Sequence, residues 1–275
     1  MKNLLLLPIL LLLLTACSST KKKSVENKRA QLFYDQGTNN LYNKDYTEAL
    51  KNLLEAYKYS PNDTKILNNL GMAYYFKKSV NNAKSFLKRS LEVDPKNSDA
   101  RMNYASILVE EKKYSDAKVQ YDRILKNLIY SKQFKTFHNL AKIELKQNNT
   151  AKAISYLKES IKSNENYCPA FFQLGKIQFE RGQYKKAERN FKEAGMGLCY
   201  KLPEPRFFRA KALVKMNQYF EAAQILEEMT ETFAMTKWET IARRGLNKVK
   251  GIHNKKTLDT LEAKNTGKTI TSPDF

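Results

Sequence analysis

Histidine and cysteine are scarce in this chain, and their scarcity limits the chemistry it can perform. Its 275 residues include 2 histidines and 3 cysteines. His138 and His253 lie far apart in the sequence, and no cysteine stands at a metal-ligand spacing. The carboxylates are scattered over predicted helix surfaces, and no pair can be assigned to a cleft. We therefore predict that the chain is not an enzyme and has no catalytic residues, no metal site and no cofactor.

A complete phosphate-binding loop is also missing. Gly267-Lys268-Thr269 matches the end of such a loop, but Glu262 stands where the first glycine is required. These residues lie in the polar segment 251–275, which lacks an apolar period. We expect that segment to be a disordered tail.

The apolar run at 4–14 is too short to span a bilayer comfortably. Lys2 precedes this run, and the small residues Thr15 and Ala16 follow it. A basic start, a short apolar region and small residues before a cleavage site are typical of a signal peptide. We therefore predict a signal peptide over residues 1–16.

The segment Leu-Thr-Ala-Cys that ends at Cys17 resembles the lipobox of bacterial lipoproteins. The resemblance implies that Cys17 carries a diacylglycerol and that the new amino terminus is acylated, for example with palmitate. Several acyl chains anchor a protein stably. Ser18 follows the cysteine and implies the periplasmic face of the outer membrane. The alternative is an ordinary secretory signal with an incidental cysteine. We interpret residues 17–29 as the lipidated cysteine and a flexible polar tether.

Small residues recur along the chain with a period near 34. Six alanines are separated by 34 to 36 residues: Ala49, Ala83, Ala117, Ala153, Ala187 and Ala222. Twelve residues before each of them stands another small residue: Gly37, Gly71, Ala105, Ala141, Gly175 and Ala210. Small residues at both positions allow two antiparallel helices to cross closely. This pattern resembles the tetratricopeptide repeat, a helix-turn-helix unit.

The resemblance implies an all-α fold, a right-handed superhelical solenoid of about six tetratricopeptide repeats with a C-terminal capping helix. The repeats fill residues 30–236 and are placed at 30–63, 64–97, 98–131, 134–167, 168–201 and 203–236. We place the capping helix at 237–250, with Ile241, Leu246 and Val249 toward the stack.

The concave face of the solenoid is the predicted site for a partner. In this repeat the sixth position of the first helix faces the groove, and four consecutive repeats carry an amide there: Asn69, Asn103, Asn139 and Gln173. An amide donates and accepts at once, so this ladder could hold the backbone of an extended peptide. Apolar contacts are predicted from Tyr34, Met72, Tyr75, Phe76 and Phe172. The alternative is that several of these aromatic residues belong to the core between repeats.

The formal net charge is +21, which favours an anionic partner. A basic solenoid in the cytosol would suit nucleic acid, but the signal peptide argues for the cell envelope and against nucleic acid. Four lysines fall on inner-helix positions that face the groove and favour an acidic peptide: Lys142, Lys146, Lys211 and Lys215. The alternative is that much of the charge lies on a solvated outer surface.

Two cysteines remain once Cys17 is assigned to the lipid, an even number in an oxidising compartment. Cys168 begins the first helix of the fifth repeat, and Cys199 follows the second helix of the same repeat. Antiparallel packing brings these two positions to the same end of the helix pair. We predict a disulfide between them; the alternative is two separate reduced thiols packed as small apolar groups.

The chain resembles the PilF/PilW lipoproteins of type IV pilus biogenesis in its combination of a lipobox, a short polar tether, six repeats and two late cysteines. Members of that family act as pilotins, which help the secretin reach the outer membrane and multimerise, or they stabilise assembled pili. The resemblance implies a scaffold that binds an outer-membrane or periplasmic protein, such as a secretin, and no small-molecule substrate. Other lipoproteins of this architecture serve outer-membrane protein insertion or peptidoglycan synthesis. A further alternative is direct binding of anionic envelope polymers by the basic surface.

Overall fold

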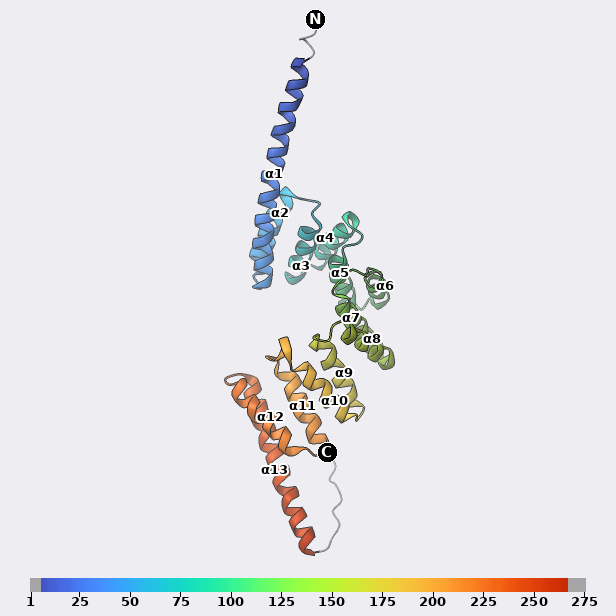
Figure 1. Ribbon diagram of the computed structural model, residues 1–275, viewed down its shortest axis with the longest axis vertical. Helices are drawn as coiled ribbons and strands as arrows, with labels where there is room; N and C mark the ends of the chain where they lie inside the picture. The colour runs from blue at the N-terminus through green and yellow to red at the C-terminus, as the bar shows by residue number, and fades with distance from the viewer. Residues whose placement is uncertain (1–5, 267–275) are drawn as a thin grey trace. The chain divides into compact units, whose positions relative to one another are not determined.

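The computed structural model describes residues 6–266 of the chain, and within that range it contains helices and turns but no strand. Contacts divide the chain into two compact units, Met1–Tyr130 and Ser131–Phe275, which are described one at a time. The helices of each unit follow one another as antiparallel pairs (Figure 1). The all-α repeat solenoid predicted from the small-residue period is confirmed.

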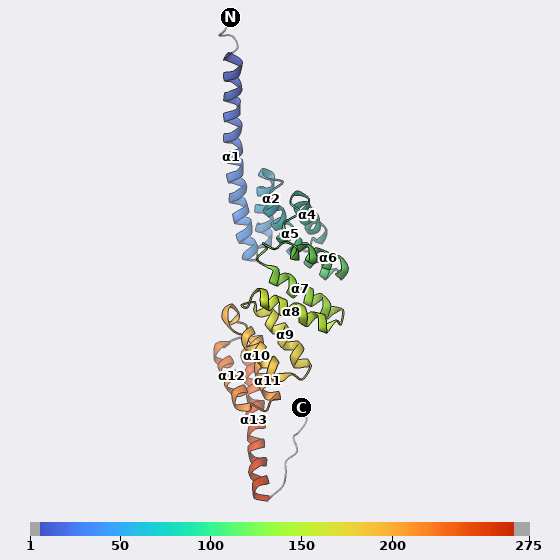
Figure 2. The ribbon, with the colours of Figure 1, turned by 45° about the vertical axis from the view of Figure 1, so that its right-hand side comes forward.

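The first unit contains three helix pairs, which Figure 2 shows from a second side. Its helices are α1 (Leu6–Tyr42), α2 (Tyr46–Tyr59), α3 (Thr64–Phe76), α4 (Val80–Val93), α5 (Ser98–Glu110) and α6 (Tyr114–Leu125). The second unit contains three further pairs and a last long helix. Its helices are α7 (Gln133–Lys146), α8 (Thr150–Ser163), α9 (Cys168–Glu180), α10 (Tyr184–Ala194), α11 (Pro203–Lys215), α12 (Tyr219–Thr232) and α13 (Lys237–Thr266).

The recurring small residues lie where the two helices of a pair cross. All six periodic alanines are fully buried. A Cβ atom placed on Gly71 would lie 2.6 Å from Cγ of Leu87, and one placed on Gly175 would lie 2.7 Å from Cε1 of Phe191. Both distances are shorter than a tolerated contact, so a larger residue would push the paired helices apart.

The turn inside each pair contains a residue in the left-handed backbone region. These residues are Lys44, Lys78, Lys112, Asn148, Gly182 and Asn217, with φ between 60° and 71°. The amide that follows each turn residue closes the helix end, as where Ser79 N donates to Tyr74 O at 2.9 Å. This is the Schellman pattern, in which a left-handed residue lets the chain reverse while terminal carbonyls stay bonded. Lysine is strained there, since only glycine, and to a lesser degree asparagine, adopts this region readily.

The first and last helices are longer than the sequence analysis expects. The tether at 17–29 was expected to be flexible, but α1 is helical from Leu6 to Tyr42. The cap was expected to end at residue 250, but α13 continues to Thr266. Lysine, glutamate, alanine and leucine in these stretches are good helix formers, and neither stretch contains a proline. The polar composition that favoured disorder therefore also permits helix. The loop-like Gly267-Lys268-Thr269 lies outside the described residues.

No helix within residues 6–266 combines the length and the apolar content needed to cross a membrane.

A disulfide joins Cys168 to Cys199 in the second unit. The S–S distance is 2.06 Å and the Cα atoms are 6.3 Å apart. Cys168 is the first residue of α9, and Cys199 ends the 3-10 turn Gly197–Cys199 that follows α10. The bridge ties the irregular connection between α10 and α11 to the start of α9. This is the pairing that the sequence predicts.

Candidate functional site: a lysine-rimmed apolar pocket

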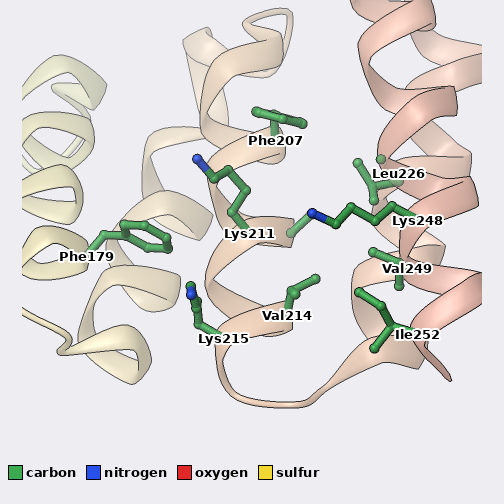
Figure 3. A pocket seen from close by; sticks show the side chains of 11 residues that line it. Phe179, Phe207, Lys211, Val214, Lys215, Leu226, Lys248, Val249 and Ile252 are labelled. Atoms are coloured by element: carbon green, nitrogen blue, oxygen red, sulfur yellow. The ribbon is translucent and has the colours of Figure 1, made fainter. Parts of the chain in front are cut away.

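An apolar pocket of about 270 Å³ lies among the last helices of the second unit (Figure 3). Its lining residues come from α9, α11, α12 and α13: Phe179, Phe207, Ala210, Lys211, Val214, Lys215, Leu226, Gly245, Lys248, Val249 and Ile252. Three of these described lining residues are lysines, and none is acidic. The pocket therefore combines an apolar floor with a cationic rim.

The lining side chains of α11 form one wall of the pocket, and those of α13 form another. On α11 the lining positions are 207, 210, 211, 214 and 215, and on α13 they are 245, 248, 249 and 252. Positions three and four apart share a helix face, so each set forms a continuous stripe. Gly245 lets α13 approach α12 closely, because a Cβ at this position would lie only 3.3 Å from Cδ1 of Leu226.

Lys211 is held over a group of phenylalanine rings. Its Nζ lies 5.1 Å from the ring centre of Phe208, 5.5 Å from that of Phe179 and 6.0 Å from that of Phe207. Aromatic faces attract an ammonium group, so the rings fix the lysine at the pocket edge while leaving it exposed. Figure 3 shows Lys248 reaching from α13 toward the α11 wall.

The rings beneath Lys211 are part of a rigid aromatic cluster. Phe191 is fully buried, and its ring centre lies 5.8 Å from that of Phe172 and 5.5 Å from that of Phe208. Phe179 lies 5.3 Å from Tyr184 in an edge-on arrangement. Edge-to-face and tilted pairs of this kind add to the stability of a cluster beyond the area buried. The pocket wall is therefore preformed.

An apolar recess bordered by lysines can hold a large apolar side chain next to carboxylates. Burying an apolar side chain of a partner is favourable by about 1.5–3 kcal/mol. The lysines add attraction for acidic groups at the rim. A short acidic peptide segment with one bulky apolar residue matches both features.

Two of the four predicted groove lysines, Lys211 and Lys215, line this pocket. Lys142 and Lys146 are exposed on α7 and do not line it. Phe172 contributes to the aromatic cluster beneath the pocket. Gln173 is half-buried in α9. Asn139 is half-buried on α7.

Sequence reasoning placed Val249 of α13 toward the stack but missed Lys248 and Ile252, which line the same pocket wall. The helix was interpreted only as a cap. One signal could have revealed the wall: Gly245 stands 35 residues after Ala210 and continues the series of small residues. By that register α13 takes the place of a seventh first helix.

The predicted amides of the first unit bond to neighbouring helices. Asn69 Nδ2 donates to Thr38 Oγ1 at 2.8 Å, which links α3 to α1. Asn103 Nδ2 donates to Asn68 Oδ1 at 2.8 Å, which links α5 to α3. Asn68 Nδ2 in turn donates to Asn69 Oδ1 at 3.1 Å. These amides therefore connect repeats to each other within the unit. A role in holding a partner's backbone stays a prediction.

The predicted aromatic residues of the first unit are also engaged within it. Phe76 stacks on Tyr46 at 4.6 Å between ring centres and remains 38% exposed. Tyr75 donates a hydrogen bond from its hydroxyl to Glu110. Burial, and then this bond, raise the pKa of Tyr75 to about 12. Tyr34 packs against the core of the unit, and Met72 is half-buried.

His138 of the second unit is mostly buried, and its pKa is lowered. Burial, and then the nearby charge of Lys142, lower the pKa of His138 to about 4. Its Nδ1 lies 3.5 Å from the hydroxyl of Tyr167. Within the described residues no group of three or more histidine, cysteine or acidic side chains could hold a metal ion.

Comparison with known proteins identifies the repeat. Models of the tetratricopeptide repeat match residues 34–83, 77–128 and 134–167. The type IV pilus assembly protein PilF of Pseudomonas aeruginosa is 22% identical over 159 residues, which is 44% of this chain and 62% of that protein. The matched segment thus spans less than two thirds of that relative.

Two solved structures share the fold over most of their length. The structure of Pseudomonas aeruginosa PilF has a TM-score of 0.65 at 16% identity, covering 80% of this chain and 98% of that one. PilW, described as a widely conserved type IV pilus biogenesis factor, has a TM-score of 0.64 at 19% identity, covering 79% of this chain and 98% of that one. The chain therefore contains tetratricopeptide repeats and has the solenoid fold of PilF and PilW.

Proposed function

We propose that this chain is a non-enzymatic scaffold that binds a protein partner in type IV pilus biogenesis, anchored to the outer membrane through Cys17. The observation that carries the proposal is the fold likeness, which covers 98% of both the PilF and the PilW chains. The lipobox-like segment before Cys17 supports the anchor. The partner that best fits this setting is a secretin, whose subunits would be helped to assemble.

The lysine-rimmed pocket of the second unit is the proposed partner site. It offers an apolar recess for one bulky side chain, and Lys211 and Lys248 stand at its edge for acidic neighbours. Because the aromatic wall is already packed, little conformational freedom is lost when a peptide binds. The proposed ligand is an acidic segment of the partner with one large apolar residue.

The anchor is tested by Cys17→Ser. We expect this variant to leave the outer-membrane fraction or to remain unprocessed, because the acyl chains that hold the protein would be absent. Intact mass and membrane fractionation measure both effects. Unchanged mass, processing and membrane association would contradict the anchor while leaving the scaffold role open to the next experiment.

The partner site is tested by Lys211→Glu combined with Lys248→Glu. Placing like charges at a charged interface is costly, so we expect partner capture to fall by about tenfold or more and secretin multimers to decrease. Lys158→Glu combined with Lys162→Glu is the matched control, since both lysines are exposed on α8 and outside the pocket. The proposal fails if the pocket variant and the control capture partner equally.

The net charge of +21 favours a second candidate, direct binding of anionic envelope polymers. Such binding would depend on total charge and weaken with salt, because screening acts on all exposed charges. The pocket variant and its control change the net charge equally and would then lose binding equally. Scaffolds of outer-membrane protein insertion or peptidoglycan synthesis share the fold class, and the identity of the captured protein distinguishes them.

A further inference from the structure

A second, strongly cationic pocket lies in the first unit, whereas the proposed partner site belongs to the second unit. Its volume is about 720 Å³, and it forms where the start of α5 meets the end of α6. Four of its lining residues are basic: Lys96, Arg101, Arg123 and Lys126. The described residues that line it include no acidic side chain.

Arg101 is the fixed centre of this cationic pocket. The residue is only 8% exposed, and its guanidinium donates to Gln120 Oε1 at 2.8 Å and to the carbonyl of Pro95. Burial, and then the charge of Arg123, lower the pKa of Arg101, while Asp94 acts in the opposite direction. Two guanidinium groups that repel each other are stabilised when an anion is placed between them.

The other three basic side chains are available to an anion. Lys96, Arg123 and Lys126 are exposed, and none of them forms an ion pair with a carboxylate of the described residues. The pocket also borders the N-terminal end of α5, where the helix dipole adds a partial positive charge. Four cations and a helix dipole thus favour a phosphate-sized anion.

Two apolar side chains protrude beside these cations. Leu128 is 88% exposed and Ile129 is 93% exposed, and both border the pocket. A peptide partner would require a recess for its apolar residues, whereas here the apolar residues stand out from the protein. Protruding apolar residues next to cations match a membrane surface, where lysine and arginine meet anionic headgroups and apolar residues reach the acyl boundary.

We propose that this face of the first unit binds a membrane surface that contains anionic phospholipids. The phosphate of a headgroup occupies the cationic pocket, and Leu128 and Ile129 enter the acyl boundary. The site is independent of the proposed pilus role and of the partner pocket.

A single tryptophan in place of Leu128, called the tip tryptophan below, tests this site in the full-length chain. Leu128→Trp in a Trp238→Phe background leaves one tryptophan, because the chain contains 1. Vesicles of neutral phosphatidylcholine are compared with vesicles that also contain phosphatidylglycerol, both carrying brominated acyl chains that quench tryptophan. We expect a blue shift and quenching with the anionic vesicles and little of either with the neutral ones. Val119→Trp in the same background places the probe on α6 outside the pocket and should stay unquenched.

Charge reversal separates a specific site from bulk attraction. Each lysine or arginine near an anionic surface contributes about fivefold in binding, so Arg123→Glu with Lys126→Glu should weaken vesicle binding by about 25-fold or more. Lys44→Glu with Lys65→Glu changes the net charge equally on exposed residues outside the pocket and should cost much less.

The proposal is overturned if the tip tryptophan remains unquenched by anionic vesicles, or if neutral vesicles quench it equally. Equal losses in the two charge-reversal variants would also overturn it, because binding would then follow total charge. Shielding of the tip tryptophan by envelope proteins in the absence of lipid would identify a protein-docking face instead.

Discussion

Gly175 lies where α9 crosses α10, and its replacement by alanine tests how the solenoid is packed. An ideal Cβ at this position lies 2.7 Å from Cε1 and 2.8 Å from Cδ1 of Phe191. Phe191 is fully buried, and the rings of Phe172 and Phe208 pack on it. The ring therefore has no free space into which it could move.

Two opposing effects determine how much Gly175→Ala changes the free energy of unfolding. Overpacking a well-filled core by one methyl group costs about 1–3 kcal/mol. Alanine also gains about 1 kcal/mol over glycine in a helix interior. Gly251→Ala, in α13 of the same unit, is the matched control because nothing lies within 4 Å of the added Cβ. Both variants gain the higher helix propensity of alanine. The difference between their free energies of unfolding is therefore the packing cost at Gly175, about 1–3 kcal/mol.

Thermal unfolding followed by circular dichroism measures this difference. We expect Gly251→Ala to unfold at or above the wild-type temperature and Gly175→Ala to unfold about 2–12 °C lower than Gly251→Ala. Equal midpoints for the two variants would refute the claim that small residues at the crossing positions are a steric requirement.

Three further predictions concern stability. Removing the Cys168–Cys199 bridge by serine substitution should lower the free energy of unfolding by about 3.5 kcal/mol in the chain-entropy model for a separation of 31 residues, as measured by denaturant titration with and without reductant. Asn69→Ala combined with Asn103→Ala should lower the free energy of unfolding by about 1–3 kcal/mol, because each substitution removes a hydrogen bond between neighbouring helices. If these amides served only to bind a partner in the groove, the double variant would fold with little change in stability. His138 stays neutral in the folded state down to a pKa of about 4, while the unfolded state takes up a proton below about pH 6.5. Stability should therefore fall by about 3 kcal/mol between these pH values, and His138→Gln should reduce that loss.

The sequence was sufficient for the helix pairs because the small-residue period reports a steric requirement. Gly71 and Ala83 are required by the short distance between two helix axes, and helices α2 to α12 follow the predicted repeats. The disulfide also followed from register, since antiparallel packing brings the start of α9, where Cys168 lies, to the same end of the pair as the turn after α10 that contains Cys199.

Other features depend on geometry that the sequence does not express. The left-handed turn residues include Lys78, a residue type that carries no turn signal. The bonds of Asn69 and Asn103 depend on side-chain direction between adjacent helices, which a periodic pattern does not specify. Lys248 and Ile252 of the α13 pocket wall were missed because the helix was interpreted only as a cap, although Gly245 continued the period.

The proposed binding of an envelope protein in the lysine-rimmed pocket can be detected directly with a photo-crosslinker. A photoreactive residue replaces Val214, which lines the pocket, or Phe220, which is 65% exposed on α12 and does not line it. After irradiation of living cells, mass spectrometry identifies the captured protein. We expect a specific adduct, with a secretin as the partner, from position 214 and not from position 220. An adduct from position 220 alone, or none from position 214 in folded protein, would contradict it.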